Sequence, residues 1–364
     1  IDVYWNTTKD LLMKTTIASS SGYSYQYKNM GQTSNKGVEL QLDAVLVDAK
    51  DFGLNFNFNI SYNRGKIDKL NGSSFWQSSS WAGTAAAGIE DFLVEEGGRL
   101  GEVYGYKTDG FYTADDFTFD AEKGTYALKA GVNDCSSLIG GKVYPGSIKL
   151  KANEDGEYKK ERLGNTVPTV SGGFGLNARW KGFDFTAFFN YSLGNKIVNA
   201  TKLGSSFYSG SSKNWNINDH FTSANRYSWI DPSTGTNLLS SASIKANGEA
   251  WTINRLNEVN TGSSIWNPAA ATVMPLVDWA VEDGSFLRVN NITIGYTLPK
   301  LFVSKLNIQN IRIYVTGYNL HCFTKYSGTD PEVDCCTSTP MTPGIDYAAY
   351  PKSRSFVGGI NVTF

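Results

Sequence analysis

Apolar and polar residues alternate with a period of two along much of this chain. The clearest stretch is 52–63, FGLNFNFNISYN, where six apolar side chains from Phe52 to Tyr62 fall on one side and small or polar side chains on the other. Successive side chains of a strand point to opposite faces, so the pattern predicts a two-faced β-strand. Its length exceeds the usual five or so residues and matches the about nine to eleven of a tilted strand that crosses a bilayer.

The same pattern predicts seven further long strands. They are expected at 3–17, 38–47, 170–180, 183–192, 286–298, 311–323 and 356–364. The segment 3–17 is the least regular of them, and the phase of 286–298 slips around Asn290 and Asn291. An extra residue in one strand shifts the alternation in this way, so the slip predicts a β-bulge.

The links between these strands alternate in length. Short links are expected at 48–51, 181–182 and 299–310, a moderate one at 18–36, and long ones at 64–169, 195–285 and 324–355. Every link longer than the short turns falls at the same end of the strands, as in outer-membrane barrels with periplasmic turns and extracellular loops. Aromatic residues near the strand ends resemble the two girdles of such barrels: Tyr4, Trp5, Phe52, Tyr62, Trp180, Phe183, Tyr296 and Phe364. The predicted fold class is all-β, a transmembrane antiparallel β-barrel with long extracellular loops.

Composition supports strands and gives little sign of nucleic-acid binding. The 364 residues include 20 Tyr, 20 Phe, 9 Trp and 37 Gly, which is strand and turn chemistry. Lys and Arg number 33 against 34 Asp and Glu, and no basic run could follow a phosphate backbone, so a nucleic-acid partner is not expected. The chain opens without Met or a signal sequence, and we expect it to be part of something longer.

Candidate chemistry is sparse. Only two histidines are present, His220 and His321, and no nucleophile, phosphate-loop or zinc-protease motif occurs, so we expect no enzyme and no cofactor. The stretch KANEDGEY at 151–158 looks like a calcium loop, but Lys151 stands where the first carboxylate belongs; a plain turn is favoured and no metal is expected.

Two further features leave alternatives open. The four cysteines, Cys135, Cys322, Cys335 and Cys336, are either disulfide-bonded in loops or unpaired thiols. The tryptophans of the long links serve either as flat surfaces for sugar or peptide ligands or as the loops' own core. They are Trp76, Trp81, Trp215, Trp229, Trp251, Trp266 and Trp279.

Several stretches, in this order, resemble the C-terminal part of SusC/RagA-type TonB-dependent outer-membrane transporters. They include EEGGRLGEVYGYKTDGFYTADDF, ERLGNTVPTVSGGFGLNARWKGFDFTAFFNYSLGNKI, VEDGSFLRVNNITIGYTLPKLF, IRIYVTGYNLHCFTKYSGTDPEV and YPKSRSFVGGINVTF. The resemblance spans nearly the whole chain. KANEDG and the cysteines of CFTKY and DCC depart from the family pattern.

The resemblance implies that residues 1–364 are the last eight or so strands of a single barrel of about 22 strands. The plug domain and the TonB box would then lie upstream. The implied function is TonB-dependent import of a large nutrient, oligosaccharide first and oligopeptide next, across the outer membrane of a Gram-negative bacterium. The implied partners are a SusD-like lipoprotein lid, TonB and outer-membrane lipid.

The candidate residues fall into three sets. Lumen-facing positions are Glu39, Asp43, Asn55, Asn57 and Arg312, and positions expected to contact substrate or lid are Tyr106, Asp109, Trp76 and Trp81. By the resemblance, the terminal Phe364 is the signal read by the barrel-insertion machinery. Two rival functions remain: a self-contained eight-stranded outer-membrane barrel acting as an adhesin, binding protein or enzyme, and a soluble carbohydrate-binding β protein.

Overall fold

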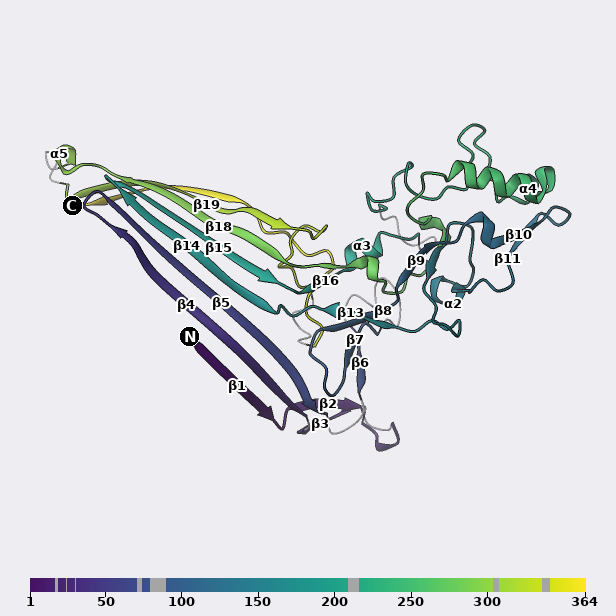
Figure 1. Ribbon diagram of the computed structural model, residues 1–364, viewed down its shortest axis with the longest axis horizontal. Helices are drawn as coiled ribbons and strands as arrows, with labels where there is room; N and C mark the ends of the chain where they lie inside the picture. The colour runs from purple at the N-terminus through teal and green to yellow at the C-terminus, as the bar shows by residue number, and fades with distance from the viewer. Residues whose placement is uncertain are drawn as a thin grey trace.

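One large antiparallel sheet dominates the computed structural model of the chain (Figure 1). The structure describes residues 1–16, 19–23, 25–29, 31–70, 74–78, 90–208, 216–303, 308–335 and 341–364. Within them the sheet has eight strands in the order β1-β4-β5-β14-β15-β18-β19-β21. Their bounds are Asp2–Lys9, Gln32–Asp48, Phe52–Lys69, Val170–Trp180, Phe183–Leu193, Phe286–Thr297, Asn310–Thr324 and Ser355–Thr363.

Seven of the predicted long strands are confirmed, and the eighth was wrong in extent. The expected strand 3–17 ends in the sheet at Lys9, after which Asp10 takes a left-handed backbone conformation with φ of 57°. Asp tolerates this conformation better than most residues, so the chain turns there. The remainder, β2 (Leu12–Thr16), pairs with β3 (Tyr25–Asn29) in a separate hairpin.

The strand register assembles one apolar face across the sheet. Phe52 pairs with Trp180, Trp180 with Phe183, and Phe183 with Tyr296. The rings of Phe183 and Tyr296 lie 4.5 Å apart, so the girdle predicted at this end of the strands is a continuous aromatic row. Ten residue steps separate Phe52 from Tyr62, or roughly 33 Å of strand, which at a tilt of about 45° gives a height close to the roughly 25 Å apolar band of outer-membrane barrels.

Register shifts in β18 and β4 adjust the alternation of the apolar rows. The predicted one lies in β18, where the register shifts between Val289 and Asn291 and leaves Asn290 unpaired against β15. An unpredicted shift in β4 falls between Val45 and Val47, and it places Val47, rather than Leu46, opposite Leu54. Strict alternation along 38–47 predicts Leu46 in the apolar row; this prediction was wrong, because a bulge moves the alternation by one residue.

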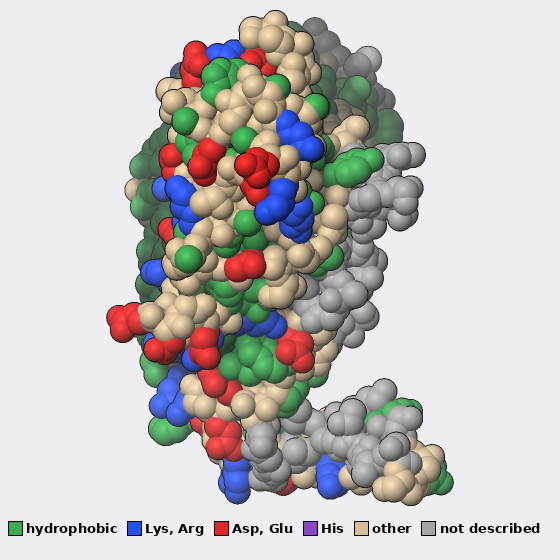
Figure 2. Space-filling model, turned by 90° about the vertical axis from the view of Figure 1, so that its right-hand side faces the viewer, with side chains coloured by type: hydrophobic (Ala, Val, Ile, Leu, Met, Phe, Trp, Pro, Cys, Tyr) green, Lys and Arg blue, Asp and Glu red, His purple; other side chains and the backbone are tan. Residues whose placement is uncertain are grey.

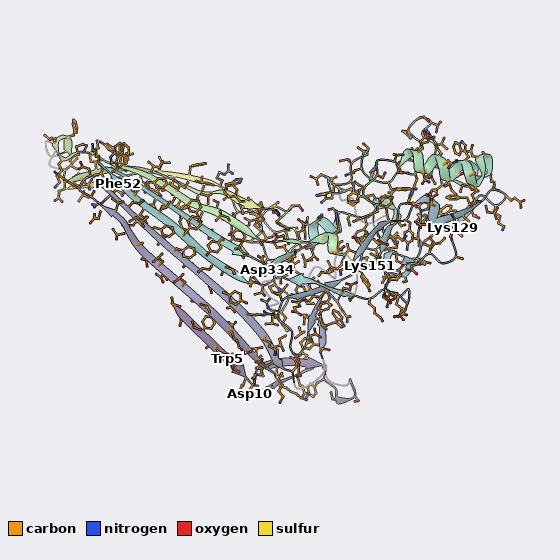
Figure 3. The ribbon with its side chains drawn as sticks, in the orientation of Figure 1. Trp5, Asp10, Phe52, Lys129, Lys151 and Asp334 are labelled. Atoms are coloured by element: carbon orange, nitrogen blue, oxygen red, sulfur yellow. The ribbon has the colours of Figure 1, made fainter. Side chains whose placement is uncertain are left out.

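The two ends of the sheet differ. At one end lie short turns, with Phe52 beside them, together with α5 (Lys300–Val303) (Figures 1 and 3). At the other end the three long links, 70–169, 194–285 and 325–354, form what we call the loop body. Its strands are β6 (Phe75–Gln77), β7 (Phe92–Val94), β8 (Glu102–Gly105), β9 (Thr108–Phe111), β10 (Phe117–Asp120), β11 (Thr125–Leu128), β12 (Ile148–Leu150), β13 (Glu161–Asn165), β16 (Lys196–Asn199), β17 (Val281–Asp283) and β20 (Ile345–Asp346). Its helices are α2 (Ser136–Ile139), α3 (Ala200–Gly204) and α4 (Ser241–Val259).

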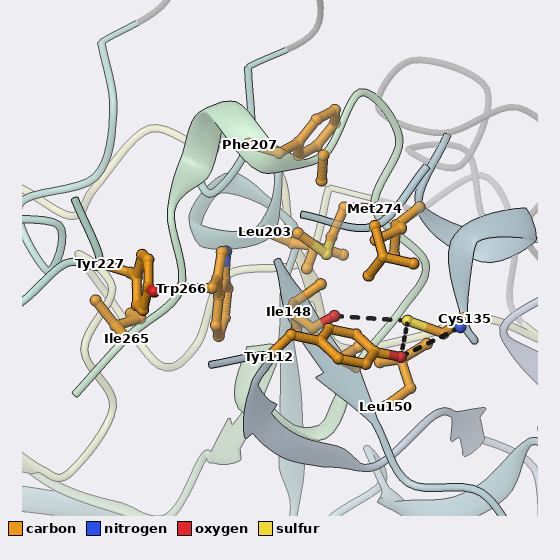
Figure 4. Close-up of a cluster of buried hydrophobic side chains, with 14 of the residues drawn as sticks. Tyr112, Cys135, Ile148, Leu150, Leu203, Phe207, Tyr227, Ile265, Trp266 and Met274 are labelled. Atoms are coloured by element: carbon orange, nitrogen blue, oxygen red, sulfur yellow. Dashed lines mark hydrogen bonds between the residues drawn. The ribbon is translucent and has the colours of Figure 1, made fainter. Parts of the chain in front are cut away.

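The loop body has a hydrophobic core to which all three long links contribute. Fully buried side chains include Tyr112 and Ile148 from the first link and Leu203 and Met274 from the second (Figure 4). Ile345 from the third link belongs to the same core. β16 joins the last two links, because it pairs with both β17 and β20. The outer surface of this body mixes cationic and anionic side chains without a single-sign field (Figure 2).

In the described part of the chain, no helix combines the length and apolarity needed to span a membrane.

Candidate functional site

The predicted lumen-facing residues gather on the polar face of the sheet. In β4 and β5, Glu39 pairs with Ser61 and Asp43 with Asn57, while the apolar row occupies the alternate positions. The hydroxyl of Ser61 donates to the Glu39 carboxylate at 3.1 Å. Alternation places Asn55 on this same face of β5, opposite Asn177 of β14.

An ion pair crosses the polar face near its short-turn end. Arg312 of β19 binds Asp184 of β15 through two hydrogen bonds, of 2.9 Å from Nε and 2.5 Å from Nη2. The strand between them, β18, carries Gly295, and a Cβ there would lie 2.5 Å from Asp184 Oδ1 and 2.6 Å from Arg312 Nη2. A glycine is therefore required for the two charged groups to meet across a third strand.

Asparagines follow the polar face toward the loop body. The side-chain oxygen of Asn59 accepts a hydrogen bond from the backbone N–H of Gly173 at 3.0 Å. The side chain of Asn57 occupies the space that a Cβ at Gly175 would need. The side-chain oxygen of Asn190 is buried and has no hydrogen-bond partner within the described residues. A buried acceptor of this kind is suited to a ligand or water, because an unpaired polar atom costs free energy.

A cavity of about 560 Å³ lies where the polar face meets the loop body. Asn59, Ser171 and Asn190 contribute from three neighbouring strands, and Pro331 to Val333 contribute from the third long link. A second hollow of about 470 Å³ lies beside it and shares Pro168 and Ser171. Amide and hydroxyl groups beside the rings of Phe188 and Phe286 suit a polar ligand with apolar surfaces.

A buried charge cluster fixes the third long link against this cavity. Arg288 of β18 donates to Glu332 through Nε and to Asp330 through Nη2, both at 2.6 Å. The side chains of Arg288 and Asp330 are only 5% and 4% exposed, and Lys352 adds a contact of 2.7 Å to Glu332. This cluster was not among the residues predicted from the sequence. The only sign of the Arg288 cluster in the sequence was the phase slip before Asn291, because the bulge there places Arg288 on the polar face.

The aromatic candidates of the loop body have mixed outcomes. Trp229, Trp266 and Trp279 pack in or against the loop core, which confirms the core interpretation for these three. Trp76 and Trp251 are exposed, at 37% and 43%. Trp76 contacts Tyr104, and the Lys160 ammonium lies 4.7 Å from the ring centroid. Trp81, Trp215 and Cys336 lie outside the described residues.

Tyr106 and Asp109 do not join Trp76 in one site. Tyr106 is half-buried against the loop core, where its N–H donates to the carbonyl of Leu276 at 2.8 Å and burial raises the pKa of its hydroxyl. Asp109 is exposed in β9, which belongs to a different sheet from the β6 strand of Trp76. Their predicted contact with substrate or lid stays a prediction.

The remaining candidates carry little chemistry. Residues 151–158 form the favoured plain turn, in which the Asn153 side chain accepts the N–H groups of Asp155 and Glu157. Cys135 is a free, buried thiol beside Tyr112, and burial raises the pKa of both groups (Figure 4). No group of three or more potential metal ligands occurs within the described ranges. His321 packs its ring against Phe323 at 4.4 Å.

Phe364 follows the end of β21 and is 80% exposed. β21 pairs with β19 alone, and β1 pairs with β4 alone, so these two strands are the edges of the described sheet. A sheet with unpaired edges is not a closed barrel of eight strands.

The chain matches no protein-family profile, but it has clear relatives. It is 30% identical over 369 residues to TonB-dependent receptor P3 of Formosa agariphila, across all of this chain and 32% of that protein. It is 23% identical over 376 residues to TonB-dependent receptor SusC of Bacteroides thetaiotaomicron, across all of this chain and 30% of that protein. The chain therefore spans about a third of the length of the curated relatives it matches.

Solved structures show the same fold. The structure of the RagAB peptide transporter matches all of this chain and 32% of its own, with a TM-score of 0.64 and 23% identity. The RagAB peptide importer in its open-open state gives a TM-score of 0.62 at 22% identity, again over all of this chain and 32% of that one. The resemblance found in the sequence and the predicted fold class are both confirmed.

Proposed function

We propose a role in nutrient import, because this chain corresponds over its whole length to part of a SusC/RagA-type TonB-dependent outer-membrane transporter. In this proposal the eight-stranded sheet is a segment of the barrel wall, with its apolar face toward lipid and its polar face toward the lumen. The loop body forms part of the extracellular mouth. The cargo is a nutrient too large for a porin.

The two-faced sheet carries the proposal. Its apolar face would be unstable in water, and residues on it such as Trp180, Ile294 and Phe356 are more than half exposed, at 56%, 56% and 69%. Lipid would cover these side chains, which supports the transporter over a soluble carbohydrate-binding protein. The open edges at β1 and β21 likewise favour a segment of a wider barrel over a self-contained eight-stranded one.

The polar face supplies the lumen side of the proposed pathway. Glu39, Asp43, Asn55, Asn57 and Arg312 would face the plug or the passing cargo. The cavity of about 560 Å³ would hold cargo beneath the loop body, with Asn190 offering its unpartnered oxygen. A SusD-like lipoprotein would close the mouth, and TonB would supply energy through a plug domain outside this chain.

Oligosaccharide is the cargo class we favour, and oligopeptide is second. The asparagine and serine side chains of the cavity suit sugar hydroxyls, and the rings of Phe188 and Phe286 suit the apolar faces of sugar rings. Peptide backbones offer similar groups, and one structural relative is named a peptide transporter.

Uptake in the native host tests the proposal. Cells with and without the full-length transporter, each with and without functional TonB, are given labelled oligosaccharide and oligopeptide pools. We expect oligosaccharide uptake to require both the transporter and TonB. Uptake of oligopeptide rather than oligosaccharide would show that the cargo is the oligopeptide class. Uptake that does not depend on TonB, or no transporter-dependent uptake from either pool, would contradict the function.

A further inference from the structure

Four cations gather on the apolar side of the sheet, just beyond its apolar band. Lys36 and Arg64 are a cross-strand pair of β4 and β5, and Lys66 is two residues further along β5. Arg99 joins them from the first long link, where Gly97 and Gly98 exchange backbone hydrogen bonds with Ile67 at 2.8 and 2.9 Å. We call Lys36, Arg64, Lys66 and Arg99 the cationic patch.

The strand register fixes the level of this patch. Val38 and Tyr62 are the last apolar pair of β4 and β5, and Lys36 and Arg64 follow two residues later on the same face. Two residues span about 6–7 Å of strand, so these charges lie immediately past the apolar band on the loop-body side. If the band is immersed in lipid, as the proposed function requires, the patch lies at the level of the outer head groups.

The cations of the patch are not paired with carboxylates. None of its four cations forms an ion pair with any Asp or Glu of the chain, all of which lie within the described residues. One carboxylate, that of Asp68, lines the same hollow, and it accepts a hydrogen bond from Ser34 at 2.9 Å. Glu102, the acidic neighbour of Arg99, is bound by Arg162 at 2.7 Å.

Like charges therefore act on one another within the patch. Burial and the charge of Arg64 lower the pKa of Arg99 from its usual range. A purely structural cluster would be expected to include counter-charges, as the Arg288 cluster does with Asp330 and Glu332. The unbalanced charge instead suits an external anion.

The surroundings favour an amphiphilic anion. The patch lines a hollow of about 590 Å³ together with Trp5 and Tyr62, two aromatic residues near the edge of the apolar band. The ammonium of Lys36 lies 3.8 Å from the Trp5 ring centroid, and Figure 3 shows Trp5 on β1 toward the loop-body end. Such rings lie at the boundary between acyl chains and head groups.

We propose that the cationic patch binds the phosphate-bearing head group of an anionic lipid in the outer leaflet. The phosphate oxygens would bind the guanidinium groups of Arg64 and Arg99 and the ammonium groups of Lys36 and Lys66. The acyl chains would lie along the apolar face below Tyr62. This inference rests on the proposed membrane location, but not on the cargo or on TonB.

Native mass spectrometry of the full-length transporter tests the proposal. The purified protein in neutral detergent is incubated with phosphatidylglycerol or with zwitterionic phosphatidylcholine, and the retained lipid is counted. The test variant is K36Q/R64Q/K66Q. The control K50Q/R179Q/K181Q removes the same number of charges, all at exposed positions of the short-turn end. Outer-membrane fractionation and heat-modifiable gel mobility establish that each variant is inserted and folded.

We expect the wild type and the control to retain phosphatidylglycerol in preference to phosphatidylcholine, and the test variant to lose this preference by about tenfold or more. An inserted test variant that keeps the preference would overturn the proposal, as would an equal loss in the control. Inorganic phosphate at millimolar concentration should not displace the lipid; complete displacement would assign a free-anion site instead. Absence of the wild type from the outer-membrane fraction would contradict the proposed function itself.

Discussion

Polar side chains of the sheet find partners on adjacent strands and also across an intervening strand. Arg312 reaches Asp184 over Gly295, and the hydroxyls of Thr293 and Thr316 meet at 2.8 Å across β18 and β19. Period-two alternation predicts which side chains share a face, and Glu39, Asn57 and Arg312 share the polar face; that this face lines a lumen stays a prediction. It does not predict which of them touch, because contact depends on register across several strands.

Asn190 is the residue whose role can be tested most directly. Replacing it with Ala removes the buried, unpartnered oxygen of the cavity wall. A hydrogen bond contributes about 0.5–1.5 kcal/mol, so the Kd for cargo should rise roughly two- to twelvefold. Isothermal titration of the intact transporter with its cargo measures the change.

Asn177→Ala is the matched control for Asn190→Ala. Asn177 occupies the same polar face but pairs with Asn55, outside the residues that line the cavity. Its substitution should leave the Kd unchanged. If the two substitutions change the Kd equally, or if Asn190→Ala has no effect, the cavity is not part of the cargo-binding site.

Arg288 is expected to hold the third long link in place. Arg288→Gln leaves Asp330 buried without its cation, and breaking a buried pair costs about 3–5 kcal/mol. We expect rapid proteolysis within 325–354 under conditions in which the wild type is protected. Cleavage sites and rates are read by mass spectrometry of the detergent-solubilised protein.

Arg179→Gln provides the comparison for Arg288→Gln. Arg179 pairs with Asp48, but their side chains are 63% and 72% exposed, and such pairs contribute about 0–1 kcal/mol. Protection of 325–354 should remain at the wild-type level in this variant. If Arg288→Gln is equally protected, the cluster does not anchor the link.

At the scale of the element, the bulge in β18 decides which side chains lie on the polar face. Strict alternation from Ile292 toward the N-terminus would place Arg288 on the apolar face. The extra residue Asn290 restores Val289 to the apolar row and turns Arg288 toward Asn190 on the polar face. The sequence revealed this bulge as a phase slip, whereas the turn at Asp10 left no comparable signal within an irregular pattern.

Deletions in β18 test this role. Removing Asn290 makes Val289 adjacent to Asn291, so alternation holds and both faces are retained. Removing Thr293 reverses the face of every residue on one side of the deletion, and Arg on the lipid face costs about 2–4 kcal/mol at the bilayer midplane, less near the interfaces. We expect the Asn290 deletion to accumulate in the outer membrane and the Thr293 deletion to be degraded, as measured by immunoblot of membrane fractions. Equal accumulation of the two would contradict the assigned faces.

At the scale of the whole molecule, the three long links behave as one folded body rather than as separate loops. Tyr112, Leu203 and Ile345 come from different links and are fully buried in one core. Link lengths indicated that such loops exist and that they share one end of the sheet. The shared core could not be predicted, because it joins residues about ninety or more positions apart and follows no local period.

The two faces of the sheet account for the period-two alternation at the C-terminal end of the chain. The alternation of FVGGINVTF is that of an edge strand whose apolar residues continue the row of β19, with Ile360 opposite Ile313. The role of Phe364 as an insertion signal stays a prediction. Within the described sheet, β19 is the one strand that pairs with β21.

Sidedness in intact cells is the most direct test of the central claim, that this sheet crosses the outer membrane with the loop body outside. Single cysteines are introduced as Glu122→Cys in the loop body and Lys50→Cys in the turn between β4 and β5, both exposed positions, in full-length protein whose native cysteines are Ser. The probe is a maleimide on a polymer too large for porins. We predict labelling of Glu122→Cys in intact cells and of Lys50→Cys only after the outer membrane is permeabilised. Labelling of Lys50→Cys in intact cells, or equal labelling of both positions, would contradict the claim that the sheet crosses the outer membrane with the loop body outside.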